Sequence, residues 1–152
     1  LKHHEFAKKT VQDLFGKDLS NAYMIEVNRS ASIIAWNDGK GKFTIQDLPL
    51  EAQLSSIADF VVEDVNDDGQ LDLIAAGNYF DLLPQFCRVD AGFGLVMIND
   101  GKKNFRALNA KQSGIYLQGA VRQIQPIRMG TETLYLFLQN QDRPRAWKRK
   151  RN

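Results

Sequence analysis

Short apolar runs rich in β-branched and aromatic residues recur along this chain, with polar and turn-forming residues between them. The clearest run is 57–63, Ile-Ala-Asp-Phe-Val-Val-Glu, and the apolar run 71–77 follows it. Short runs rich in Val, Ile and Phe predict strands, and further runs of this kind lie at 22–27, 32–36, 44–48, 92–98, 119–127 and 133–138. Hairpin-type turns join several of them. The predicted fold is therefore mainly β and antiparallel.

The opening segment has a different period. Ala7, Val11, Leu14 and Phe15 recur at helical spacing within residues 4–15, and Gly16 follows as a C-terminal cap. One short amphipathic helix is predicted to begin the chain.

Two turns repeat each other. Asn37-Asp38-Gly39-Lys40 and Asn99-Asp100-Gly101-Lys102 lie 62 residues apart, and each follows an apolar strand and leads to a phenylalanine. Asp-Gly between apolar runs favours a hairpin, because the turn requires positive φ. A repeat of this length with about four strands per unit suggests propeller blades. A third unit over 119–138 turns at 128–132 with one carboxylate, so one metal site is predicted.

That site is the stretch 64–72, which holds four carboxylates and two side-chain amides between two strands. Hard cations such as Ca²⁺ take several oxygens from one short loop, and such a loop needs a glycine to bend it, here Gly69. The predicted ligands are the side chains of Asp64, Asn66, Asp68 and Asp72 and the carbonyl of Gln70. Asp67 points away at an even position. Asp59 and Glu63, upstream, are expected to face solvent.

The stretch has two other interpretations. An EF-hand requires an acidic residue at position 12, which is Ala75, and helices on both sides, whereas the flanks are predicted strands. A plain solvated turn is the remaining alternative, because Asn, Asp and Gly are ordinary turn residues. Carboxylates at alternate positions repel one another without a cation, which favours the metal site.

Charge is uneven along the chain. The net charge is +2, but six basic residues lie within 143–151. The rest of the chain has 14 basic and 18 acidic residues. The body is thus mildly acidic. The basic tail either binds phosphate or anionic lipid or is a frayed, solvated end, and no basic face elsewhere supports specific nucleic-acid binding.

Other chemistry has little support in the composition. The single cysteine, Cys87, excludes an internal disulfide and is expected to be buried as a small hydrophobe, and His3 and His4 are the only histidines. No apolar run is long enough for a membrane helix. The start, Leu1-Lys2-His3-His4-Glu5, resembles neither a signal peptide nor an initiator methionine, so a piece of a longer precursor is expected.

The aromatic-rich stretch 79–93 shows no clean period. It is expected either to fold onto the sheet as part of the core or to present a partner surface.

Together, the acidic loop, the strand 71–76 and the Asn-Asp-Gly-Lys turns resemble the FG-GAP/VCBS repeat family. These repeats form the blades of integrin α-subunit propellers and of many bacterial secreted or surface proteins, including those with an ASPIC/UnbV-type module. The family loop D-x-[DN]-x-D-G-x-x-D matches Asp64, Asn66, Asp68, Gly69 and Asp72. The bacterial members add similarity at Ala52-Gln53, Gly77-Asn78-Tyr79 and 88–94.

The resemblance implies an incomplete propeller fragment over 1–152. Its expected parts are a helix and linker (1–20), a partial blade (21–50), a calcium-loop blade (57–110), a last blade (115–140) and a basic tail (141–152). It also implies structural Ca²⁺ and an extracytoplasmic adhesion scaffold, secreted or at the cell surface. This scaffold would bind a protein or glycan and associate with the rest of a larger propeller.

The alternative function is an enzyme, a carboxylate-based hydrolase or metal-dependent enzyme at the propeller face, with Asp90 or Glu132 as candidate carboxylates. The body of the chain offers no Ser-His or Cys-His pair and no glycine-rich phosphate loop for catalysis. The sequence therefore favours a binding scaffold over catalysis.

Overall fold

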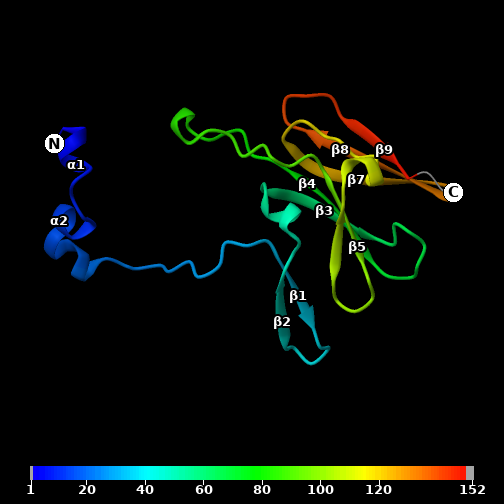
Figure 1. Ribbon diagram of the computed structural model, residues 1–152, viewed down its shortest axis with the longest axis horizontal. Coiled ribbons are helices and arrows are strands. Elements are labelled where there is room, and N and C mark those ends of the chain that lie inside the picture. Colours follow the sequence, from blue (N-terminus) through cyan, green and yellow to red (C-terminus); the bar gives the residue numbers. More distant parts are fainter. Residues whose placement is uncertain (1, 150–152) are drawn as a thin grey trace. The chain divides into compact units, whose positions relative to one another are not determined.

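The computed structural model describes residues 2–149 (Figure 1). The chain divides into two compact units, Leu1–Ser30 and Ala31–Asn152. All of the strands belong to the second unit.

The first unit contains the helices α1 (His3–Phe6) and α2 (Val11–Phe15) and the 3₁₀ helix η1 (Gly16–Asn21). The prediction of one continuous helix over 4–15 is wrong, because Thr10 is extended and starts a new helix. Its hydroxyl accepts from the Asp13 N–H at 3.1 Å, and its own N–H donates to the Asp13 carboxylate at 2.9 Å. This reciprocal cap stabilises a helix start.

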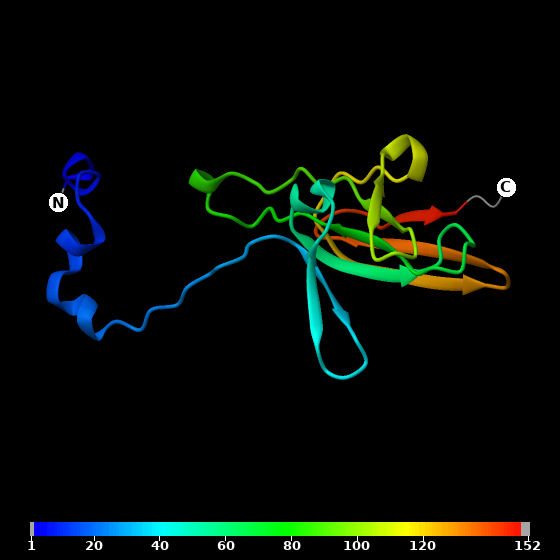
Figure 2. The ribbon, with the colours of Figure 1, turned by 60° about the horizontal axis from the view of Figure 1, so that its bottom comes forward.

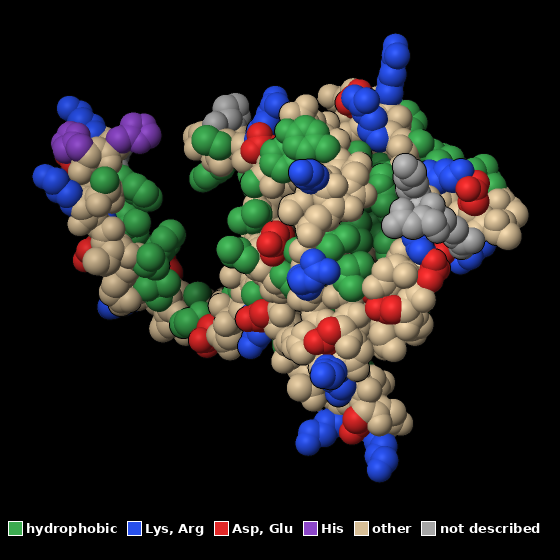
Figure 3. Space-filling view, turned by 45° about the vertical axis from the view of Figure 1, so that its right-hand side comes forward, with side chains coloured by type: hydrophobic (Ala, Val, Ile, Leu, Met, Phe, Trp, Pro, Cys, Tyr) green, Lys and Arg blue, Asp and Glu red, His purple; other side chains and the backbone are tan. Residues whose placement is uncertain are grey.

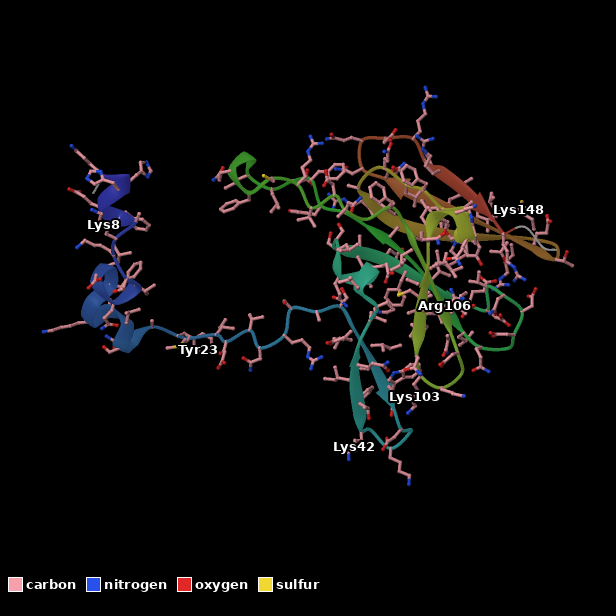
Figure 4. All side chains as sticks on the ribbon, in the orientation of Figure 1. Lys8, Tyr23, Lys42, Lys103, Arg106 and Lys148 are labelled. Atoms are coloured by element: carbon pink, nitrogen blue, oxygen red, sulfur yellow. The ribbon has the colours of Figure 1, made fainter. Side chains whose placement is uncertain are left out.

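No strand occurs at residues 22–27, so that prediction is also wrong. The side chains of Tyr23, Ile25 and Val27 are all exposed, and Figure 4 shows Tyr23 on this extended segment. The apolar run favours a strand, but backbone groups need a neighbouring strand to form a ladder, and no strand within residues 2–149 pairs with this segment.

Three antiparallel sheets build the second unit, which confirms the mainly β, antiparallel prediction. Sheet neighbours follow chain order throughout, in orders β1-β2, β3-β4-β5-β6 and β7-β8-β9. The strands are β1 (Ile33–Asn37), β2 (Phe43–Asp47), β3 (Ile57–Glu63), β4 (Asp72–Gly77), β5 (Leu95–Asn99), β6 (Phe105–Leu108), β7 (Val121–Met129), β8 (Glu132–Gln139) and β9 (Arg145–Lys148). Short helical turns η2 (Leu50–Gln53), η3 (Pro84–Phe86) and α3 (Ala110–Ser113) connect them.

The four-stranded sheet buries both of its faces to different degrees. On one face, Ile74 and Val96 pack with Tyr135 and Phe137 of the three-stranded sheet, and β7 lies alongside β3 and β4 (Figure 2). On the other face, Ala75 and Met97 form a smaller cluster with η2. Because β4 is covered on both sides, its side chains are almost all buried.

The two repeated turns have the same hydrogen bonds. The N–H groups of Gly39 and Gly101 donate to the side chains of Asn37 and Asn99 at 2.8 and 3.0 Å. Both glycines have positive φ, as the hairpin prediction requires. Lysine and aspartate side chains cluster at the tip of the β1–β2 hairpin, at the bottom of Figure 3.

The described part of the basic tail is ordered, so the expectation of a frayed end is wrong there. β9 pairs with β8, with Trp147 opposite Tyr135. The Trp147 indole N–H donates to the Ser113 carbonyl at 3.0 Å, and its ring lies 5.3 Å from that of Tyr135. These contacts of Trp147 hold the strand in place, and the charge pattern of the tail did not reveal them. Lys150 and Arg151 lie outside the described residues.

Residues 79–91 form an arm that projects from the sheet (Figure 1). A bridge between Tyr79 and Val89 closes its base. Leu83 and Phe86 are exposed by 61% and 66%, so the core alternative is wrong for these two residues. Cys87 is exposed with positive φ, which corrects the expectation of a buried thiol. The arm is apolar in composition but packs little of its surface.

Candidate metal centre

The acidic loop joins β3 to β4 and is wound around the carboxylate of Asp64. That carboxylate accepts the N–H of Gly69 at 2.8 Å and the N–H of Asp68 at 3.2 Å. Asp68 in turn accepts the N–H of Gln70 at 2.7 Å. Gly69 has a φ of +81°, a value that favours glycine, so the bend falls where the sequence predicted it.

Asn66 lies between the two aspartates and contacts Asp68 twice. Its side-chain oxygen accepts the Asp68 N–H at 3.2 Å, and its amide nitrogen donates to the Asp68 carboxylate at 2.7 Å. Both side chains are exposed. The loop thus gathers the side chains of Asp64, Asn66 and Asp68 around one bend.

Asp72 differs from the other predicted ligands because it is fully buried. Its two oxygens accept the N–H groups of Val65 at 2.9 Å and Asn99 at 2.8 Å. Burial raises the pKa of Asp72, the two backbone hydrogen bonds oppose that rise, and repulsion from Asp68 and Asp64 adds to it. A cation near the loop would relieve this repulsion.

Gln70 is the fifth predicted ligand, through its carbonyl. It follows the bend, and its side chain lies against Gly101 of the repeated turn, where an added Cβ would meet the Gln70 Cδ at 3.2 Å. Asn99, from the same turn, donates its side-chain amide to the Leu71 carbonyl at 3.1 Å. The second Asn-Asp-Gly turn therefore packs against the acidic loop and donates a hydrogen bond to it.

Asp67 lies on the outside of the loop, as its even position predicts, and it is bound by Arg149. The guanidinium donates from Nη1 to Asp67 Oδ1 at 3.0 Å and from Nη2 to Oδ2. This contact spans 82 residues, so no local pattern could reveal it. In the sequence, only the cluster of basic residues in the tail drew attention to Arg149.

The expectation that Asp59 and Glu63 face solvent is wrong. Asp59 accepts the N–H of Ile124 at 2.8 Å, and Glu63 accepts the hydroxyl of Tyr135 at 2.7 Å. Both carboxylates lie on the face of β3 that meets the three-stranded sheet. Desolvation and the Glu63 carboxylate raise the pKa of Tyr135, which keeps this hydroxyl a donor.

The donor set fits a hard cation in chemistry, since it offers three carboxylates, one amide oxygen and one backbone carbonyl. Within residues 2–149, no three His, Cys, Asp or Glu side chains are gathered closely enough to form a metal-binding group. The oxygens of Asp64 and Asp68 accept loop N–H groups instead. Rotation of these two side chains about their single bonds would be needed to bring their oxygens to one ion.

The two carboxylates weighed for catalysis lie in different surroundings. Glu132 forms an ion pair with Lys148 at 2.6 Å and lines an open polar pocket of about 290 Å³ beside Glu63, Asp64 and Asp67. Asp90 lies at the base of the exposed arm, outside the lining of that pocket. The lining of this pocket therefore includes Glu132 but not Asp90.

Among the helices of residues 2–149, none has the length and hydrophobicity needed to cross a membrane. Comparison of the chain with family models, with curated proteins and with solved structures found no match.

Proposed function

We propose that this protein is a calcium-stabilised binding scaffold whose sheets are blades of a propeller. The observation that carries the proposal is the acidic loop itself. The loop places Asp64, Asn66 and Asp68 at alternate positions before the bend at Gly69. The negative charges of Asp64 and Asp68 repel the buried carboxylate of Asp72. Calcium bound there by Asp64, Asn66, Asp68, Gln70 and Asp72 would supply charge neutralisation and hold the β3–β4 connection.

The sheet arrangement supports the propeller part of the proposal. β3 to β6 form a four-stranded antiparallel meander in chain order, as a blade does. Phe60 and Val62 of β3 are exposed by 59% and 49%, beside an apolar groove of about 760 Å³ between β1 and the four-stranded sheet. Further blades of a larger propeller would cover such a surface, since large apolar patches mark interfaces.

The proposed setting is extracytoplasmic, secreted or at the cell surface, because calcium sites of extracellular modules bind at about 10⁻⁴ to 10⁻³ M. The proposed partner is a protein or glycan at the cell surface. Leu83 and Phe86 of the arm support a contact made by residues 79–93, since both side chains are exposed.

A thermal melt tests the calcium role. The wild type is compared in chelator and in millimolar Ca²⁺, beside Asp68→Ala and the control Asp38→Ala, which removes a carboxylate from the repeated turn. A ligand that binds only the folded state raises the melting temperature with its concentration. A shift in the wild type and in Asp38→Ala, lost in Asp68→Ala, supports the proposal. No shift in any of them rejects it.

A further inference from the structure

The contact between Arg149 and Asp67 places a fixed positive charge beside the acidic loop. The side chain of Arg149 is only 24% exposed, whereas that of Asp67 is 59% exposed. A shielded guanidinium with a two-point contact interacts more strongly than an ordinary surface pair. Arg149 therefore belongs to the immediate surroundings of the loop.

The charge of Arg149 also reaches the first predicted ligand. The pKa of Arg149 is raised, first by its hydrogen bond to Asp67 and then by the charges of Asp67 and Asp64, while burial opposes the rise. Asp64 and Arg149 also line the same polar pocket, so their opposite charges attract. The carboxylate of Asp64 would be a ligand of the proposed calcium ion.

The position of Arg149 is set by the neighbouring strand. It follows β9 directly, where Trp147 opposite Tyr135 anchors the strand in the core. Tyr135 also donates to Glu63, the residue before Asp64. The start of the loop is thus held by Tyr135 of β8, and its outer carboxylate is held by Arg149, which follows β9.

From this geometry we infer that Arg149 is the resident counter-charge of the acidic loop and sets its calcium affinity. The inference rests on the calcium role proposed above. Without metal, Arg149 offsets the mutual repulsion of the loop carboxylates. With metal, the same positive charge repels the ion, so Arg149 lowers calcium affinity while it stabilises the metal-free loop. Arg149 is a positioning residue here, since it acts through Asp67 and Asp64.

Four single variants, and the double variant Arg149→Gln with Asp67→Asn, separate this role from simple packing. Arg149→Gln removes the charge, Arg149→Lys keeps it, and Asp67→Asn removes the partner while suiting the positive φ of that position. The matched control is Lys148→Gln, because Lys148, labelled in Figure 4, is the preceding residue. Its ion pair is with Glu132.

The first measurement is a thermal melt in chelator, which involves no calcium. Arg149→Gln and Asp67→Asn should each lower the melting temperature, and the double variant should lose no more than the larger single loss. Arg149→Lys should retain most of the stability. Additive losses would overturn the inference, and so would an equal loss in Arg149→Lys and Arg149→Gln.

The second measurement is a calcium titration by calorimetry at low salt. The dissociation constant should fall about two- to tenfold in Arg149→Gln and stay near that of the wild type in Arg149→Lys and Lys148→Gln. At about 1 M salt, the constants of all variants should approach that of the wild type. An unchanged or higher constant in Arg149→Gln would overturn the inference. If the wild type binds no calcium, the proposed function fails, and the chelator melts alone decide whether Arg149 is the counter-charge.

Discussion

The buried carboxylate of Asp72 accepts the backbone N–H of Asn99 at 2.8 Å, which joins the end of the acidic loop to the end of β5. Its other oxygen accepts the N–H of Val65 at 2.9 Å, within the loop. One side chain therefore satisfies two backbone donors whose residues are 34 positions apart in the chain. Such a bridge joins the acidic loop to β5 through one buried side chain.

Replacing Asp72 should destabilise the metal-free protein. Asp72→Ala leaves the N–H groups of Val65 and Asn99 without this acceptor, at a cost of about 2 kcal/mol in the free energy of unfolding. Urea unfolding in chelator measures the loss. The control is Asp90→Ala, which removes an exposed carboxylate and should change little. Equal stability of Asp72→Ala and wild type would contradict the bridging role.

Two glycines with positive φ separate backbone strain from metal binding. Gly69 in the acidic loop and Gly130 in the β7–β8 turn have φ of +81° and +62°, and open space surrounds each. Alanine at either position should cost about 1–2 kcal/mol through strain alone. Gly69→Ala should in addition weaken calcium binding in a titration, and Gly130→Ala should not. Equal calcium affinity in the two variants would show that the Gly69 bend does not shape the site.

Alanine substitutions distinguish the arm from the core. Phe137 is fully buried in the larger cluster, so Phe137→Ala should lower the free energy of unfolding by about 3–5 kcal/mol. Phe86 lies exposed in the arm, and Phe86→Ala should cost less than about 0.5 kcal/mol. Denaturant titration of both variants makes the comparison. A large loss in Phe86→Ala would mean that the arm is part of the folded core.

The exposed Cys87 should be reactive in the folded protein. Because it is the single cysteine, a chromogenic thiol reagent should report one accessible thiol per chain without denaturant. The matched sample in denaturant gives the same final count. Labelling that occurs only after unfolding would mean that the Cys87 thiol is buried, as expected from the sequence.

Local pattern predicted most of the second unit. The β-favouring run at 57–63 gives β3 with the same bounds, and Asp-Gly marks both repeated turns. Local pattern failed at 22–27, because an apolar run shows which side chains could be buried but not whether a neighbouring strand exists. It failed again at Trp147, whose partly buried ring lies among six basic residues of the tail.

The sequence predicted which residues of the loop form the candidate site, but not the contacts that distant residues make with them. Positions 64, 66, 68, 69 and 72 follow from spacing, and the loop bends at Gly69. The hydrogen bond from Asn99 to the loop, the contact of Arg149 with Asp67 and the bond between Tyr135 and Glu63 join residues far apart in sequence. Spacing cannot encode such contacts, because they depend on how the sheets pack.

The central claim is that the acidic loop binds calcium, and direct titration with Ca²⁺ tests it. A calorimetric titration of the chelator-treated wild type should give one ion per chain with a dissociation constant of about 10⁻⁴ to 10⁻³ M. Asp68→Ala should lose this binding, whereas Asp38→Ala should retain it. Absence of binding at millimolar calcium, or equal binding by wild type and Asp68→Ala, would contradict the account.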